Sequence, residues 1–109
     1  MGQGKTFGAL IADARERRAQ SQKELAALIK KEDGQPISPQ YLNDIERDRR
    51  NPPSEHLIRQ FAEALDIDVD RLCFAAGTVP SDLRHDVIRA DPDSCNAAFK
   101  AFRRAIRRR

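Results

Sequence analysis

The stretch from Ser21 to Leu65 constrains the fold most, because helix start and stop signals divide it into three short helices. Ser21 and Glu24 have the S-x-x-E spacing of a capping box, in which each side chain satisfies a backbone N–H at a helix start. Ser38 can cap a second helix, and Pro39 suits its first position, where a missing N–H costs nothing. We therefore expect a short helix, a polar turn and a second short helix in this order.

Helical periodicity extends over the whole chain, and no run alternates as a half-buried strand does. We expect an all-α fold, with five helices in the first two thirds of the chain and one or two after them. Three of the expected helices span residues 6–18, 38–47 and 81–88. The others begin at Ser21, Ser54, Asp68 and Asp91. The expected core consists of Phe7, Leu10, Ile11, Ala14, Leu25, Leu28, Ile29, Leu42, Ile45, Leu57, Ile58, Phe61, Ala62, Leu65 and Leu72.

Composition excludes several classes of protein. A chain of 109 residues suits one domain with a modest core. No apolar run approaches the ~20 residues that cross a bilayer, and the polar start has no secretory hydrophobic region. We therefore expect a soluble cytoplasmic protein with no membrane partner. A net charge of +3 and a pI of about 9.2 are compatible with nucleic-acid binding without requiring it.

The cysteines and histidines are isolated in the sequence. Cys73 and Cys95 could form a disulfide, bind a metal with His56 and His85, or pack as small hydrophobes. No CxxC or HxxxH spacing supports a metal, so the third interpretation is favoured. No Ser, His and Asp arrangement is typical of a catalytic site. We expect no enzyme activity, no cofactor and no metal.

The helix from Ser38 to Arg47 is the candidate reader of DNA bases. If Leu42 and Ile45 face the core, its other face is open, and the alternative is an ordinary solvated surface. Gln and Asn can make bidentate bonds to adenine, and Arg to guanine, while Asp could accept from cytosine or repel phosphate. The side chains on or beside this face are Gln40, Tyr41, Asn43, Asp44 and Arg47.

Phosphate contacts are expected on either side of that helix. The free N–H groups at the helix start after Ser21 suit a phosphate, and Gln22 can add a side-chain bond. Arg49 and Arg50 follow the reading helix, where they lie near a phosphate strand or remain solvated charges. Such contacts fix register without reading sequence.

Leu10 to Gly77, about two thirds of the chain, resembles the helix-turn-helix domain of the Cro and repressor type, the Xre family. Each matching segment is weak, and the ordered set at near-correct spacing is strong. The segments are Ala14-Arg15-Glu16-Arg17-Arg18, Ser21-Gln22-x-Glu24-Leu25-Ala26, Tyr41-Leu42-x-x-Ile45-Glu46, Pro52 or Pro53, and Leu57-x-x-x-Phe61-Ala62-x-Ala64-Leu65-Asp66-Ile67-x-Val69-x-x-Leu72.

The resemblance implies five packed helices and a transcriptional repressor that binds a pseudo-palindromic operator in double-stranded DNA as a homodimer. The bound protein would be associated with the nucleoid. By position, Gln22 contacts a phosphate, and Arg15 pairs with Glu46 to orient the reading helix. The residues that face the groove by position are Ser38, Gln40, Tyr41, Asn43 and Asp44.

Two features depart from the family pattern. The turn at Lys30–Ile37 is about six residues longer than usual, so Lys30 to Asp33 either touch the DNA backbone or form a neutral insertion, which we favour. Asp48 replaces the glycine that commonly follows the reading helix. Aspartate tolerates the left-handed conformation better than most residues, so we expect the loop to be preserved.

A helical extension with an Arg-rich end, residues 79–109, follows the expected DNA-binding domain, residues 1–78. Its apolar stripe is Cys95, Phe99, Phe102 and Ile106. This stripe could pack on the preceding domain, pair with a second copy, or bind a partner protein, and the arginines could add phosphate contacts. The alternative function is therefore an antitoxin-like or co-regulatory interaction module.

Overall fold

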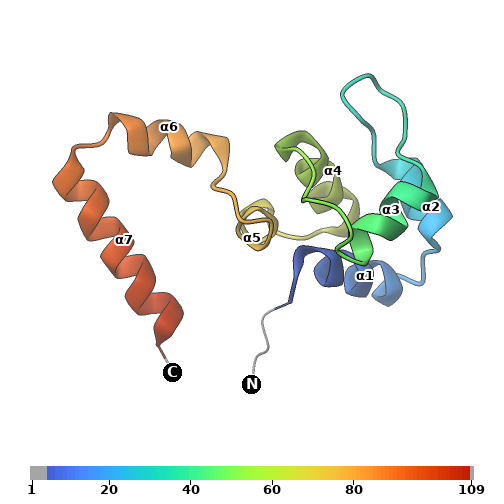
Figure 1. Cartoon of the computed structure of the whole chain (residues 1–109), viewed down its shortest axis with the longest axis horizontal. Helices are drawn as coiled ribbons and strands as arrows, with labels where there is room; N and C mark the ends of the chain where they lie inside the picture. The colour runs from blue at the N-terminus through green and yellow to red at the C-terminus, as the bar shows by residue number, and fades with distance from the viewer. Residues whose placement is uncertain (1–4, 109) are drawn as a thin grey trace. The chain divides into compact units, whose positions relative to one another are not determined.

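The computed structural model describes residues 5–108, and these residues form helices joined by turns and one small hairpin (Figure 1). The helices are α1 (Phe7–Arg17), α2 (Gln22–Leu28), α3 (Pro39–Glu46), α4 (Glu55–Leu65), α5 (Val69–Ala75), α6 (Ser81–Arg89) and α7 (Pro92–Arg107). The all-α prediction is confirmed. The chain divides between Val79 and Pro80 into two compact units, which are described separately.

Side-chain caps fix the starts of the helices in the first unit. Ser21 and Glu24 form the complete capping box of α2, as the sequence predicts. The side chains of Ser38, Ser54 and Asp68 cap α3, α4 and α5, each by accepting one backbone N–H of its helix. These residues satisfy backbone donors that a helix start leaves unpaired, so the sequence determines where each helix begins.

The core of the first unit lies between α1, α2, α3, α4 and α5. The rings of Phe7 and Phe61 meet edge to face at its centre, with centroids 6.2 Å apart. Leu28 contradicts the predicted core, because its side chain is 52% exposed. The reason is that α2 ends at Leu28 and the extended backbone of Ile29 turns inward, so Ile29 is buried in its place. Leu10 packs against the core and is only partly buried.

A close contact between α1 and α3 sets the angle of α3. A Cβ atom on Gly8 would lie 2.3 Å from the carbonyl oxygen of Ile45, so only glycine fits there. Asp48 has the predicted left-handed backbone, with φ of 57°. Its carboxylate accepts hydrogen bonds from Gly8 N (3.1 Å) and Thr6 Oγ1 (2.7 Å), which ties the end of α3 to the start of α1.

The long turn between α2 and α3 is an ordered hairpin arm, which we define as residues 30–36 (Figure 1). Lys30 pairs with Pro36 in an isolated β-bridge, and the turn at Gly34 has φ of 87°. The arm is attached to α4, because Lys30 N donates to Gln60 Oε1 (3.0 Å) and His56 Nε2 donates to Lys30 O (2.9 Å). The insertion therefore leaves the packing of α2 and α3 on the core intact.

The second unit consists of α6 and α7, and no side chain of either helix is buried. On α7, Phe99 is 50% exposed, Phe102 is 46% exposed and Ile106 is 67% exposed. Asp91 caps α7 as predicted, by accepting from Ser94 N (2.9 Å).

Neither cysteine forms a disulfide, and the two differ in burial. Cys73 is buried as a small hydrophobe, whereas Cys95 is partly exposed, with its Sγ 3.5 Å from Val87 O. The prediction of a buried hydrophobe is therefore correct for Cys73 and wrong for Cys95, because α7 buries none of its side chains. Among residues 5–108, no helix is long and apolar enough to cross a membrane.

Candidate nucleic-acid interface

The face of α3 opposite its core contacts is open and polar. Leu42 and Ile45 are buried and the Glu46 side chain is shielded, which leaves the other α3 side chains at the surface. The structure brings the predicted reading residues together on this face: Gln40 and Arg47 are exposed, and Tyr41, Asn43 and Asp44 are partly exposed. Ser38 is at the start of the helix, with its Oγ accepting from Tyr41 N (3.0 Å), so the hydroxyl oxygen already serves as a cap.

A bidentate ion pair holds the buried side of α3. Arg15 Nε lies 2.7 Å from Glu46 Oε2, and Arg15 Nη2 donates to Glu46 Oε1 at 3.0 Å. The Arg15 side chain is 13% exposed and that of Glu46 only 5%. The pKa of Arg15 lies above its ordinary value, chiefly because its guanidinium donates to Glu46. The pair therefore stays charged and links α1 to α3.

Gln22 joins this pair to the open face. Its Nε2 donates to Glu46 Oε1 (2.9 Å) and to Asn43 Oδ1 (3.1 Å). Arg47 Nε also donates to Asn43 Oδ1, at 3.3 Å. The sequence places a phosphate contact on Gln22, but both of its amide hydrogens are used within the protein. The capping box uses Ser21 N and Glu24 N, so the backbone N–H groups that it leaves at the start of α2 are those of Gln22 and Lys23.

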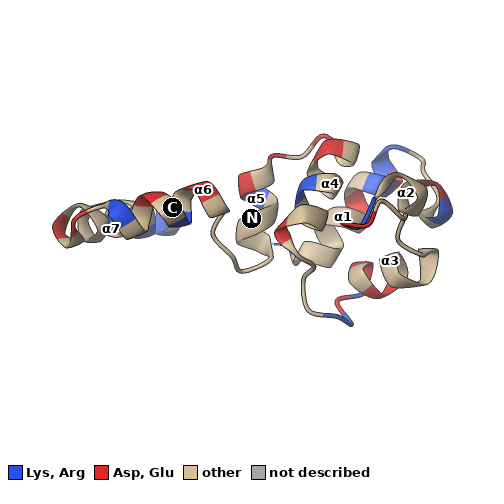
Figure 2. Cartoon of the chain, turned by 90° about the horizontal axis from the view of Figure 1, so that it is seen from above, with Lys and Arg blue, Asp and Glu red and all other residues tan. Residues whose placement is uncertain are grey.

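A second group of contacts covers the outer edge of α3. The Arg50 guanidinium lies over the Tyr41 ring, 5.0 Å from its centroid, and Arg50 Nε is 3.6 Å from Asp44 Oδ2. Gln40 Nε2 donates to the other Asp44 oxygen at 3.1 Å. The negative charge of Asp44 is therefore balanced by Arg50, which reduces its repulsion of a nearby phosphate. Arg49 and Arg50 are exposed in the loop after α3 (Figure 2).

The sequence does not predict the hydrogen bonds that tie Asp48 to the start of α1, or the close contact of Gly8 with α3. The family pattern predicts the left-handed backbone of Asp48 but not its hydrogen-bond partners, since these lie about forty residues away along the chain. The arm contributes little net charge, because Lys30 and Lys31 are balanced by Glu32 and Asp33. Lys30 Nζ is also held at the end of α2, where it donates to Ala27 O at 2.9 Å.

Within residues 5–108, no group of three or more His, Cys, Asp or Glu side chains is placed to hold a metal.

The comparisons with known proteins agree with this geometry. A family model described as a helix-turn-helix domain matches residues 6–85, well over half of the chain. The search of curated proteins found no match. The search of solved structures found none either. The matched range includes the α2–α3 pair and every side chain on the open face of α3, so the chain belongs to the helix-turn-helix domain family, consistent with the Cro and repressor type.

Proposed function

We propose that the protein is a sequence-specific DNA-binding regulator that represses transcription by occupying a pseudo-palindromic operator. The supporting observation is the open polar face of α3, held by the Arg15–Glu46 pair beside the capped start of α2. In this proposal α3 enters the major groove, as recognition helices of this motif do. The bound protein blocks the polymerase.

The contacts divide into base readers and phosphate binders. Gln40, Asn43 and Arg47 face base edges in the proposed complex, while Arg49 and the start of α2 contact phosphates. In the complex, Arg50 either gives up its ion pair with Asp44 to contact a phosphate, or contacts Asp44 and a phosphate at the same time. Base contacts carry specificity and phosphate contacts carry salt-dependent affinity.

The proposed operator complex is a homodimer, and α7 is its proposed contact surface. Cys95, Phe99 and Ile106 lie on one side of α7 with large exposed area on Phe99 and Ile106. Apolar stripes of this kind mark association surfaces. We assign DNA binding to residues 1–78 and pairing to residues 79–109.

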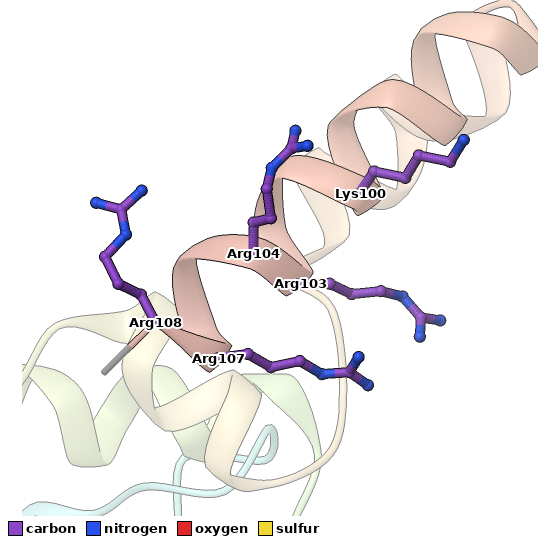
Figure 3. A pocket seen from close by; sticks show the side chains of 5 residues that line it. All are labelled: Lys100, Arg103, Arg104, Arg107 and Arg108. Carbon is purple, nitrogen blue, oxygen red and sulfur yellow. The ribbon is translucent and has the colours of Figure 1, made fainter.

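Charge favours an antiparallel arrangement of two α7 helices. Asp91 and Asp93 lie at the start of α7, and five basic side chains lie between residue 100 and the C-cap residue Arg108. Figure 3 shows these side chains extending away from the helix: Lys100, Arg103, Arg104, Arg107 and Arg108. A parallel pair would place ten cations together, whereas an antiparallel pair places each acidic start beside the partner's basic end.

The first test is selection of sheared genomic DNA by the purified protein at ~150 mM salt, followed by sequencing. The proposal expects one inverted repeat, with half-site centres ~34–36 Å apart. Featureless enrichment would favour the protein-interaction module instead.

Two variants of the open face test the division of contacts. Asn43→Ala should relax the preference at one base position, whereas Arg50→Ala should weaken binding to all sequences and reduce the salt slope. An unchanged preference in Asn43→Ala would show that α3 is not the reader.

The α7 surface is tested with two variants that introduce the same charge. Ile106→Asp should convert the dimer to a monomer in sedimentation equilibrium, because a carboxylate then lies within the apolar stripe. Ala101→Asp, on the opposite side of α7, is the matched control and should remain dimeric. If both variants and the wild type are monomers, the stripe instead serves a different protein partner.

A further inference from the structure

The polar face of α3 contains an amide whose orientation is fixed from the interior of the protein. The chain of contacts starts at Glu46, whose carboxylate oxygens can only accept hydrogen bonds. Arg15 holds this carboxylate through bonds of 2.7 and 3.0 Å. Gln22 must therefore present its amide nitrogen to Glu46, at 2.9 Å, because its carbonyl oxygen would meet a negative charge.

The same constraint passes to Asn43. The second hydrogen of Gln22 Nε2 is directed at Asn43 Oδ1, at 3.1 Å, so Asn43 must present its oxygen to Gln22. Arg47 Nε approaches the same oxygen at 3.3 Å. A carbonyl oxygen has two acceptor positions, and these two donors use both. The group that Asn43 retains for a ligand is its Nδ2, which carries two donors.

We propose that Asn43 acts only as a hydrogen-bond donor and selects guanine over adenine at the base position that it contacts. The proposal rests on the proposed function and names the base that this side chain prefers. The usual bidentate contact of asparagine with adenine needs the side-chain oxygen to accept from N6. Guanine instead presents two acceptors, N7 and O6, to the major groove, and these match the two free hydrogens of Nδ2.

Burial keeps the chain of amides in this orientation when DNA is bound. Glu46 and Arg15 are largely shielded from solvent, so no water replaces the bonds that a reversed Gln22 amide would lose. Gln22 is thus a positioning residue: it does not need to touch the base, yet it determines which atoms of Asn43 face the groove.

Selection from a random DNA library tests the proposal. The position read by Asn43 is identified as the one whose preference disappears in Asn43→Ala. The wild type should favour guanine there. Gln22→Met removes the shorter of the two hydrogen bonds to Asn43 Oδ1 and leaves only the 3.3 Å bond from the exposed Arg47. The Asn43 amide can then rotate, so the adenine-to-guanine ratio should rise about ten-fold, equivalent to ~1.4 kcal/mol. Lys23→Met is the matched control, since Lys23 is exposed on the same turn, and it should leave the preference unchanged.

A preference for adenine in the wild type, or an identical preference in Gln22→Met, would overturn the proposal. NMR of the labelled full chain without DNA tests the amide orientation separately. The side-chain amide hydrogens of Gln22 should exchange with water more slowly than those of Asn43. Slower exchange at Asn43 would overturn the proposal even where the protein binds DNA, whereas protection at Gln22 in a protein that selects no DNA would instead refute the proposed function.

Discussion

Ala19, between α1 and α2, has a left-handed backbone with φ of 55°. This conformation costs a residue with a Cβ atom roughly 1–2 kcal/mol. Asp48 and Asp66 share the conformation, but aspartate tolerates it better than alanine does. Ala19 is exposed, so its side chain makes no buried contact that offsets the cost.

Replacing Ala19 with glycine should therefore stabilise the protein. Relief of the left-handed strain exceeds the ~0.4–1 kcal/mol that glycine adds to the entropy of the unfolded chain, which leaves a gain of about 0.5–1 kcal/mol. Urea unfolding of Ala19→Gly measures the change. Ala12→Gly in the middle of α1 is the control, and it should lose about 1 kcal/mol. A loss in both variants would contradict the prediction.

The opposite substitution at Gly8 should be destabilising. A Cβ atom there would meet two backbone oxygens, Ile45 O at 2.3 Å and Glu46 O at 2.7 Å, so α1 and α3 must separate. We expect Gly8→Ala to lower the free energy of unfolding by roughly 1–3 kcal/mol, although alanine is the better helix former. Urea unfolding measures the loss, and a variant as stable as the wild type would show that α3 does not depend on this contact.

Among the elements, α7 depends on a single carboxylate at its start. The pKa of Asp91 lies below its ordinary value, first because the Ser94 backbone N–H bonds the carboxylate and second because the Ser94 hydroxyl does so. The folded helix therefore binds this proton less readily than the unfolded segment. Its stabilisation is complete above the ordinary carboxyl pKa of about 3.9 and is lost as the pH falls through the lowered value.

The Ser94 amide should report this titration. Its NMR shift is expected to change with a midpoint below the ordinary carboxyl pKa, because the cap bond persists until Asp91 is protonated. Asp91→Asn keeps a capping side chain and should abolish the transition. Asp93→Asn removes an equal charge from the same turn and should retain it. A midpoint at or above the ordinary value would show that the cap bond is absent.

Capping explains which elements could be predicted from the sequence. Each cap acts within two to four residues, so Ser21, Ser38, Ser54 and Asp91 locate helix starts without knowledge of the fold. The end of α2 has no such local signal, because it depends on Ile29 turning into the core. Helical periodicity therefore predicts Leu28 to be buried, which is wrong.

In the candidate site too, features that depend on residues close in sequence could be predicted, and features that depend on residues far apart could not. Periodicity identifies the open face of α3, since Leu42 and Ile45 define its buried side. The hydrogen bonds of Gln22 to Glu46 and Asn43 cross from α2 to α3, and no spacing rule predicts them. The group that a side chain leaves available for DNA is therefore visible only in the structure.

At the scale of the whole molecule, the hydrophobic core among residues 5–108 belongs to the first unit. Its buried residues run from Phe7 to Cys73, and α6 and α7 contribute none. The buried side chain of the second unit is Pro80, at its first position. We expect a chain that ends at Pro80 to unfold cooperatively in urea, because it keeps every buried side chain of residues 5–108. It should be a monomer, because it lacks α7, the proposed pairing helix. Loss of cooperative unfolding would place part of the folding information beyond Pro80.

The hairpin arm shows that the distance along the chain between α2 and α3 is not what sets their crossing angle. The arm closes on itself through the Lys30–Pro36 bridge, so its two ends leave the core at neighbouring points, and its tip at Asp33 and Gly34 is exposed. The tip should therefore tolerate insertions. A peptide epitope, a fluorophore attachment residue or new chain termini could be introduced there without moving α3.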